Sequence, residues 1–141
     1  MNYSRRILFL FIGVALLFGI GYLRTMTSGN TEEALRHRIV AEWEAKKNRN
    51  FGAVYDMAAE AYRQKVSRDI FLQRKHVGIQ KFSVKSLEMS ESGKEALSEV
   101  EFTTKQMGFD FTFKSKESWV WEGGEWRLDI SVKPLKLPGM K

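Results

Sequence analysis

The hydrophobic pattern of this chain changes twice, and its first part is an uncharged apolar run. Ile7–Leu23 is a run of seventeen residues without a charge, with Arg5 and Arg6 before it and Arg24 after it. At a helical rise of ~1.5 Å per residue the run extends ~25 Å, and ~17 apolar residues is the short end of the lengths that cross a bilayer. The run therefore predicts a transmembrane helix that anchors the chain through residues 1–24.

A cleaved secretory signal is the alternative interpretation, because it also begins with basic residues and continues with an apolar segment. The run is longer than the ~7–15 apolar residues usual in such signals, and Arg24–Gly29 contains no Ala-x-Ala cleavage site. We therefore favour a retained anchor. Since basic residues concentrate on the cytoplasmic side, Arg5 and Arg6 favour a cytoplasmic N-terminus, a single span of the cell inner membrane and a periplasmic C-terminal domain.

Two small residues in the run, Ala15 and Gly19, have the small-xxx-small spacing that lets two membrane helices approach closely. Small residues are also common in membrane helices that make no such contact. The anchor thus carries one candidate site for contact with a partner helix.

After a polar linker, residues 25–30, apolar residues recur at helical spacing. Leu35, Ile39 and Trp43 lie four residues apart and share one face, which predicts a helix over about residues 31–48. Asn30, with a glutamate three residues later, has the pattern of an N-cap and its capping-box partner.

Two shorter helices are expected next. The first starts at Phe51 and continues or restarts after a bend. The second spans residues 68–75 after the N-cap Ser67, and we expect it to dock through Ile70 and Phe71.

From Ile79 onward the hydrophobic period changes to two, which predicts strands. Alternating residues define about four of them, approximately residues 82–89, 96–104, 109–121 and 126–130. The last turn, Glu122–Glu125, is expected to bring Trp121 and Trp126 together as a cross-strand pair. Helices followed by an antiparallel meander define the α+β class, and we assign residues 31–132 to this domain and 133–141 to an extended tail.

Composition narrows the function classes. The 141 residues carry a net charge of +6, but three arginines belong to the anchor, so the rest has 20 basic against 17 acidic residues. No basic face is expected from this balance, and we expect no nucleic acid among the partners. The absence of cysteine excludes a disulfide framework, so a hydrophobic core must hold the fold.

The order of the elements is similar to that of a known family. The segments Asn50–Met57 and Ser67–Phe71 and the ending Trp119–Leu128 resemble the helices and final hairpin of nuclear transport factor 2-like domains, also called cystatin-like cone domains. The resemblance implies three helices packed on a curved antiparallel sheet of about four strands. The family includes enzymes such as ketosteroid isomerase and dehydratases. It also includes non-catalytic domains behind one membrane span, such as an inner-membrane subunit of type IV secretion machines, and the layout of this chain resembles that group.

Candidate chemistry is sparse. No Gly-x-Ser-x-Gly elbow occurs, and His37 and His76 have no second ligand at metal spacing, so we expect neither a metal nor another cofactor. We expect His76 instead to cap a helix end. The cone cavity that the resemblance implies has four candidate lining residues, which are Trp43, Tyr55, Asp56 and Tyr62.

Aromatic residues in excess of what the core needs would leave an exposed patch for a partner. Trp119, Trp121 and Trp126 are the candidates for such an interface. Core packing is nevertheless favoured for the wider aromatic set, which adds Phe109, Phe111 and Phe113. The edge strands of the meander are a second way to bind another chain.

These patterns predict a membrane-anchored, non-catalytic accessory or assembly subunit of a membrane protein complex. Its partners would be the lipid bilayer and either other membrane subunits or its own copy. The alternatives are a domain that binds a small ligand in the cone cavity and a small acid–base enzyme that uses Asp56.

Overall fold

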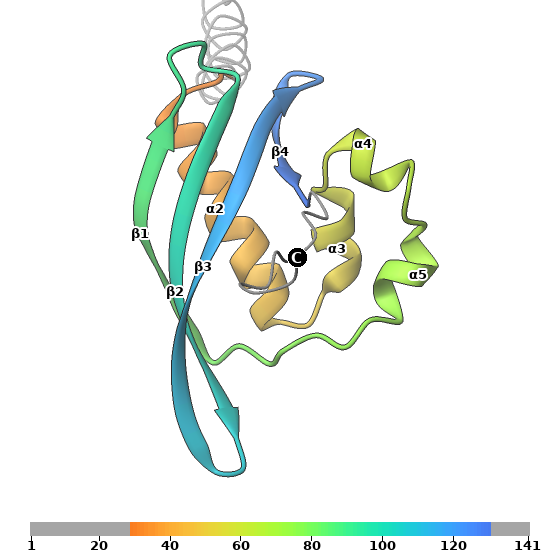
Figure 1. The fold of residues 1–141 in the computed structure, drawn as a ribbon, viewed down its shortest axis with the longest axis vertical. Coiled ribbons are helices and arrows are strands. Elements are labelled where there is room, and N and C mark those ends of the chain that lie inside the picture. The colour runs from red at the N-terminus through yellow and green to blue at the C-terminus, as the bar shows by residue number, and fades with distance from the viewer. Residues whose placement is uncertain (1–28, 131–141) are drawn as a thin grey trace, which may run out of the picture.

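The computed structural model describes residues 29–130, and the predicted membrane anchor and the tail beyond Ile130 lie outside this range. The described helices, labelled as in Figure 1, are α2 (Glu32–Lys47), α3 (Phe51–Asp56), α4 (Glu60–Arg63) and α5 (Arg68–Leu72). The strands are β1 (Lys81–Met89), β2 (Glu95–Gln106), β3 (Phe109–Glu122) and β4 (Glu125–Asp129). Between Gly29 and Ile130, no helix is both long enough and apolar enough to span a membrane.

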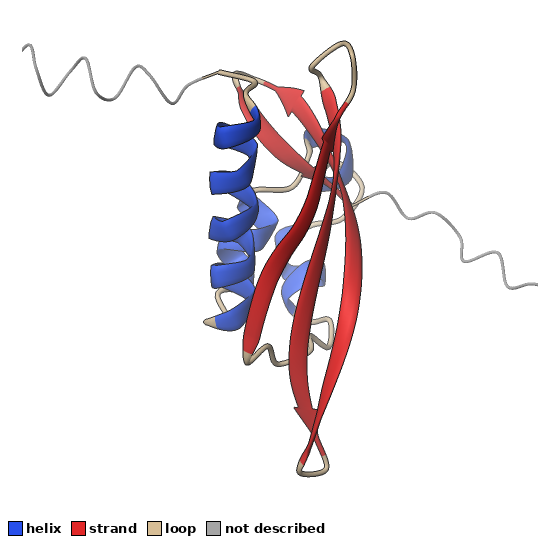
Figure 2. Ribbon diagram, turned by 90° about the vertical axis from the view of Figure 1, so that its left-hand side faces the viewer, coloured by secondary structure: helices blue, strands red, loops and turns tan. Residues whose placement is uncertain are grey.

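The four strands form one antiparallel sheet in the order β1-β2-β3-β4, an open meander. The long helix α2 lies along one face of this sheet, and the short helices α3 to α5 lie beside it near β4 (Figures 1 and 2). Helices followed by an open antiparallel sheet confirm the predicted α+β class and the approximate strand count.

The start of α2 differs from the prediction by one residue. The N-cap is Thr31, whose Oγ1 accepts a hydrogen bond from the N–H of Ala34 at 3.2 Å. Asn30 instead donates from Nδ2 to the carbonyl oxygen of Gly93 at 3.0 Å. The predicted capping role of Asn30 is therefore wrong, because its side chain is used to tie the chain to the β1–β2 turn.

The predicted N-cap of α5 is confirmed, since Ser67 Oγ accepts from the N–H of Ile70 at 3.4 Å. The helix ends at Leu72, earlier than predicted, and His76 Nε2 lies 3.2 Å from the Phe71 carbonyl oxygen near this end, as expected of a capping side chain. Only Phe71 docks against the domain. The predicted docking of Ile70 is wrong, because this residue is 55% exposed.

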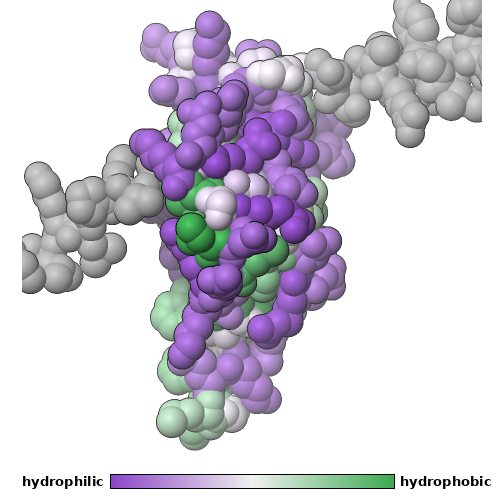
Figure 3. Space-filling model, turned by 90° about the vertical axis from the view of Figure 1, so that its right-hand side faces the viewer, coloured by the Kyte–Doolittle hydropathy of each residue, from purple (hydrophilic) through white to green (hydrophobic). Residues whose placement is uncertain are grey.

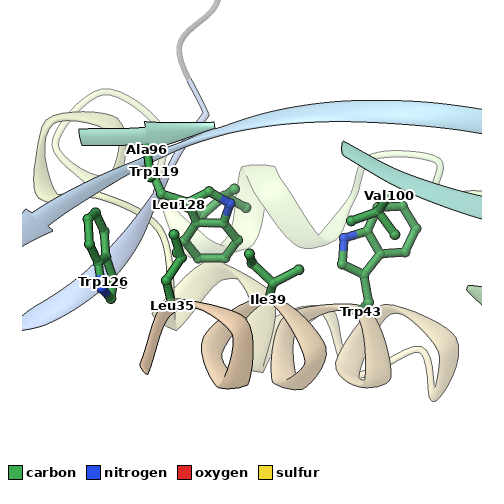
Figure 4. Packing of buried hydrophobic residues seen from close by; sticks show 8 residues of the cluster. All are labelled: Leu35, Ile39, Trp43, Ala96, Val100, Trp119, Trp126 and Leu128. Carbon is green, nitrogen blue, oxygen red and sulfur yellow. The ribbon is translucent and has the colours of Figure 1, made fainter. Parts of the chain in front are cut away.

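The predicted apolar stripe of α2 is confirmed as one side of the main core. Leu35, Ile39 and Trp43 are buried against residues of β2, β3 and β4 (Figure 4). The sheet side of this cluster consists of Ala96, Val100, Trp119, Trp126 and Leu128. A second, smaller cluster joins α3, α4 and α5 and contains Val54, Tyr55, Ala58, Tyr62 and Phe71.

The longest strand, β3, runs well past the helix that covers it. At ~3.3 Å per residue its 14 residues extend ~46 Å, whereas the 16 residues of α2 extend only ~24 Å. The β2–β3 hairpin therefore projects beyond the helical layer (Figures 1 and 2). Its tip lies at the end of the sheet opposite the β1–β2 turn, to which Asn30 is bound.

Candidate functional site

A pocket of about 730 Å³ lies between α2, α3, the connection from α5 to β1, and the middle of the sheet. Its apolar walls include Trp43, Val54 and Phe102, and several basic side chains also line it. The basic residues are Lys46, Arg74, Lys75, His76 and Lys116, and they outnumber the two acidic residues of the lining, Glu117 and Asp129. An apolar hollow with basic groups at its wall is suited to a ligand that combines an apolar body with an anionic group.

Of the four predicted cavity residues, only Trp43 lines this pocket. Tyr55 is buried in the second cluster, where its hydroxyl donates to the Val66 carbonyl oxygen at 2.8 Å. Tyr62 belongs to the same cluster, and its hydroxyl accepts from Arg74 Nη1 at 3.0 Å.

The predicted position of Asp56 in the cavity is wrong. Its side chain is 65% exposed, and its Oδ1 lies 3.7 Å from Nε of Arg68. Helix α3 turns Val54 and Tyr55 inward, so the residue that follows them points to solvent. An acid–base role for Asp56 in this pocket therefore has no geometric basis.

Three charged side chains meet beside the pocket, where sequence reasoning expected none. Lys46 Nζ lies 2.6 Å from Oε1 of Glu42 and 2.6 Å from Oε1 of Glu117. Glu42 is fully buried. Trp43 fixes the group by donating from Nε1 to Glu117 Oε2 at 2.9 Å, and Lys46 Nζ lies 4.1 Å from its ring centroid.

This buried cluster holds two carboxyl groups and one ammonium group, so it cannot be neutral if both carboxyls are ionised. Burial raises the pKa of Glu42 to about 8, with repulsion from Glu117 adding to the effect and Lys46 opposing it. Burial disfavours the charged form of Lys46, but Glu42 and Glu117 outweigh it and raise the pKa of this lysine. At neutral pH Glu42 therefore holds a proton and the cluster is neutral.

The spacing of residues in the sequence already placed two members of the cluster on the buried face of α2. Glu42 and Lys46 lie seven and eleven residues after Leu35, so they continue the buried stripe that begins there. Glu117 lies two residues before Trp119 on the same face of its strand. A charged residue at such a position is either exposed at the end of the stripe or buried with a partner, and only the fold distinguishes these outcomes.

The second candidate site is the projecting β2–β3 hairpin. Apolar side chains follow its strand β3 outward from the core, with Phe113 48%, Phe111 43% and Phe109 70% exposed. The ring centroid of Phe113 lies 5.8 Å from that of the half-buried Phe102 and 6.4 Å from that of Phe111, which makes a continuous aromatic strip. Figure 3 shows apolar atoms gathered on the hairpin at the lower end of the molecule.

The turn at the hairpin tip has an unfavourable residue. Met107 (φ 50°) and Gly108 (φ 87°) form a two-residue turn with both residues in the left-handed region. Asparagine and glycine are suited to the first position, whereas a methionine costs roughly 1–2 kcal/mol there. Met107 is also 97% exposed, so neither backbone preference nor core packing explains its presence.

The tryptophans proposed as a partner interface are placed differently from the hairpin phenylalanines. Trp119 and Trp126 are buried in the main core, and Trp119 Nε1 donates to Ser98 Oγ at 3.0 Å. Trp121 is half-buried and pairs with Trp126 as predicted, with ring centroids 5.5 Å apart. Trp119 and Trp126 therefore present no surface to a partner in the folded domain. The anchor residues Ala15 and Gly19 lie outside the described residues.

The favoured core role of the phenylalanines is wrong for the hairpin. Phe109, Phe111 and Phe113 lie on the helix-facing side of the sheet, as the alternation predicted, but no described helix reaches them. Within residues 29–130, no three His, Asp or Glu side chains lie close enough together to hold a metal ion.

Comparisons with known proteins do not assign this chain to a protein family. No protein-family model matches this sequence, and no curated protein sequence matches it. Among solved structures, the domain is similar to the intermembrane space region of the chloroplast protein ARC6, with a TM-score of 0.42 and 15% sequence identity. The similarity covers 70% of this chain and 93% of that chain, and it is too distant to indicate a function. Fold and site thus define an α+β domain with an open four-stranded sheet and a projecting apolar hairpin.

Proposed function

We propose that this chain is a membrane-anchored, non-catalytic subunit that helps to assemble a membrane protein complex. The uncharged run Ile7–Leu23 supports an anchor, and the basic residues before it support an extracytoplasmic position for the domain. The element order, a long helix and shorter helices before an antiparallel sheet, supports a nuclear transport factor 2-like domain behind this anchor.

One observation carries the proposal, which is the exposed apolar strip on the projecting hairpin. Phe109, Phe111 and Phe113 offer an apolar face, and Met107 extends it to the tip at a cost in backbone energy. A subunit that binds a partner retains such residues because the complex, not the isolated domain, buries them. The tip is separated from the Asn30 end of the domain by the length of β2, ~40 Å, so it reaches away from the linker.

The test uses the tagged full-length chain, extracted in mild detergent and analysed for proteins that co-purify with it. The variant Phe109→Ser with Phe111→Ser removes half-exposed apolar surface from the hairpin. Its matched control, Ile70→Ser with Val77→Ser, removes side chains of similar exposure, 55% and 51%, elsewhere. We expect the hairpin variant to lose the co-purifying subunit at least about tenfold while the control retains it.

Two results would contradict the proposal. One is a full-length chain that purifies alone and as a monomer. The other is a mature chain found free in the soluble fraction and trimmed near Thr27, which would replace the anchor by a cleaved signal.

A second function is favoured by the pocket itself. We infer that its apolar wall and its basic residues suit an amphipathic anion, and 730 Å³ is in the range of small-ligand sites. Ser115, which lines the pocket, is a position where tryptophan would fill it. Binding of the fluorescent apolar anion anilinonaphthalene sulfonate should be lost in Ser115→Trp and retained in the hairpin variant. If the dye instead binds Ser115→Trp and fails to bind the hairpin variant, the dye site is the hairpin and the pocket is no ligand site.

A further inference from the structure

The outer edge of β3 is unpaired over the projecting hairpin. Strand β4 pairs with β3 only from Glu122 back to Ser118, where Asp129 is its last paired residue. The N–H of Ile130 donates to the Leu128 carbonyl oxygen at 3.2 Å, and Ile130 does not continue the β3–β4 ladder. Within the described residues, the stretch Phe109–Glu117 therefore has a strand on its β2 side and none on its other side. Such an edge is a template for pairing with another chain.

Alternate residues of β3 direct their backbone groups to this open edge. The two-residue turn at 107–108 makes Phe109 a hydrogen-bonded partner of β2, so the odd-numbered residues that follow it also bond to β2. The N–H of Trp121, which donates to the Lys94 carbonyl oxygen at 2.8 Å, fixes the same alternation from the other end. The free N–H and C=O groups accordingly belong to Asp110, Thr112, Lys114 and Lys116.

The side chains along this edge are self-complementary about Thr112. Asp110 precedes it by two residues, Lys114 follows it by two, and Phe111 and Phe113 flank it. When a second copy of the strand is laid antiparallel with Thr112 opposite Thr112, each Asp110 faces a Lys114 and each Phe111 faces a Phe113. Opposite charges and aromatic residues are the cross-strand pairs that stabilise an antiparallel ladder.

We propose that β3 pairs edge to edge with β3 of a second copy of this chain, antiparallel and centred on Thr112. The inference deepens the proposed function, on which it rests, by naming the chain itself as a partner. In this register the backbone groups of Asp110, Thr112 and Lys114 meet groups that also point outward, so all are satisfied. Shifting the centre to Phe113 would place Phe109 opposite Glu117 and Phe111 opposite Ser115, which leaves one aromatic pair, Phe113 with Phe113, in place of two.

The described structure leaves this edge accessible. Thr112 and Asp110 are exposed, and Asp110 makes no salt bridge within residues 29–130. Lys114 Nζ lies 2.9 Å from Glu99 Oε1, and an ammonium group has three donors, so it can bond a second carboxylate. The two-fold axis is normal to the sheet, which places the two Asn30 ends far apart at opposite ends of the dimer.

The test exploits the absence of cysteine from the chain. Thr112→Cys in the full-length chain, in mild detergent, should give a dimer with a short bis-maleimide crosslinker. Glu91→Cys, in the turn at the opposite end of the sheet, should give none, because the proposed geometry separates these sites widely. Crosslinking at Glu91→Cys without crosslinking at Thr112→Cys would mean that copies meet side by side through their anchors and would overturn the inference.

Charge reversal tests the register. On the Thr112→Cys background, Asp110→Lys and Lys114→Asp each place like charges opposite one another, so each alone should crosslink about tenfold less. A mixture of the two variants restores both opposite-charge pairs and should recover the crosslinked product. Equal loss in the mixture would contradict antiparallel pairing about Thr112. Far-ultraviolet circular dichroism of each variant reports whether the domain is folded.

These outcomes separate the inference from the proposed function. If another subunit co-purifies but Thr112→Cys remains uncrosslinked, the subunit role stands and self-pairing is wrong. If Thr112→Cys crosslinks but the chain purifies with no other subunit, self-pairing stands and the role in a larger complex fails.

Discussion

The two hairpins that share β3 have the same sequence pattern, but the aromatic residues of one are mostly buried and those of the other are exposed. Each closes through a two-residue turn with positive φ angles, Gly123-Gly124 in one and Met107-Gly108 in the other. In each, aromatic residues alternate along β3 on the helix-facing side of the sheet. Trp119 in the first is fully buried, whereas Phe109 in the second is 70% exposed.

The difference between them is the presence of a covering helix. α2 covers about half the length of β3, and the covered half includes the main core. Burial is therefore decided by what lies above a strand and not by the alternation along it. An aromatic strip that is patterned like a core but extends past its cover remains an exposed apolar surface of the folded domain.

The charged residues of the two halves differ in the same way. Beneath α2, Glu42, Lys46 and Glu117 form a buried cluster, whereas on the hairpin Lys114 and Glu99 form a surface pair. The buried charges beneath α2 need opposite charges beside them, because an unpaired charge away from water is costly. The surface pair on the hairpin contributes little, because water solvates each charge.

The largest contrast is expected from truncating one aromatic residue in each half. Trp119→Ala should destabilise the domain by about 3–5 kcal/mol, because it empties a buried volume and leaves Ser98 without its donor. Phe111→Ala should cost less than about 1 kcal/mol. Urea unfolding followed by circular dichroism measures both. Similar losses would mean that the hairpin is covered after all.

Removing one lysine from each half is expected to give the next largest difference. Lys46→Met leaves the buried Glu117 carboxylate without its cation and should cost about 3 kcal/mol at pH 7. Lys114→Met should leave the unfolding midpoint close to that of the unaltered chain, since its partner Glu99 remains hydrated. A comparable effect of the two substitutions would show that the buried cluster is open to water.

The pH dependence of stability should come mainly from the covered half. Because the pKa of Glu42 is raised to about 8 in the fold, the folded state binds its proton more tightly, and stability should fall as pH rises from about 5 to 9. Glu42→Gln cannot ionise, so it should match the unaltered chain near pH 4, exceed it by on the order of 2 kcal/mol near pH 6, and exceed it by more at pH 9.

The matched control for this measurement is Glu99→Gln. The hydrogen bond from Lys114 lowers the pKa of Glu99, so its contribution is lost only as pH falls through that lowered value. In thermal unfolding at several pH values, the difference in stability between Glu42→Gln and the unaltered chain should therefore grow toward alkaline pH, and the difference between Glu99→Gln and the unaltered chain should change only at acidic pH. An alkaline loss of stability that persists in Glu42→Gln would assign it to another group.

The smallest effect is expected at the two turns. Met107→Asn should stabilise the isolated domain by up to about 1 kcal/mol, because asparagine tolerates the left-handed conformation. Gly124→Ala should destabilise it by about 1 kcal/mol for the same backbone reason, since no side chain crowds that position. We also expect Met107→Asn to weaken co-purification of the partner. A stabilised hairpin that binds as well as before would show that Met107 makes no contact with it.

Local pattern was sufficient to predict the elements. The four-residue spacing of Leu35, Ile39 and Trp43 predicted α2, the period of two predicted the strands, and the residues around Gly123-Gly124 predicted the Trp121–Trp126 pair. It failed for Asp56, because the way α3 packs on the domain turns this residue outward. It failed for the N-cap, because Asn30 binds the β1–β2 turn, a segment distant in the sequence.

The sequence by itself determined which residues share a face, because helix and strand periods are properties of the local backbone. Only the tertiary structure decided which of those faces are covered, because coverage depends on how far a helix of 16 residues reaches along a strand of 14. The strand rises about twice as far per residue as the helix, so β3 extends past α2. The phenylalanines of β3 that lie beyond the helix, Phe109, Phe111 and Phe113, are therefore exposed.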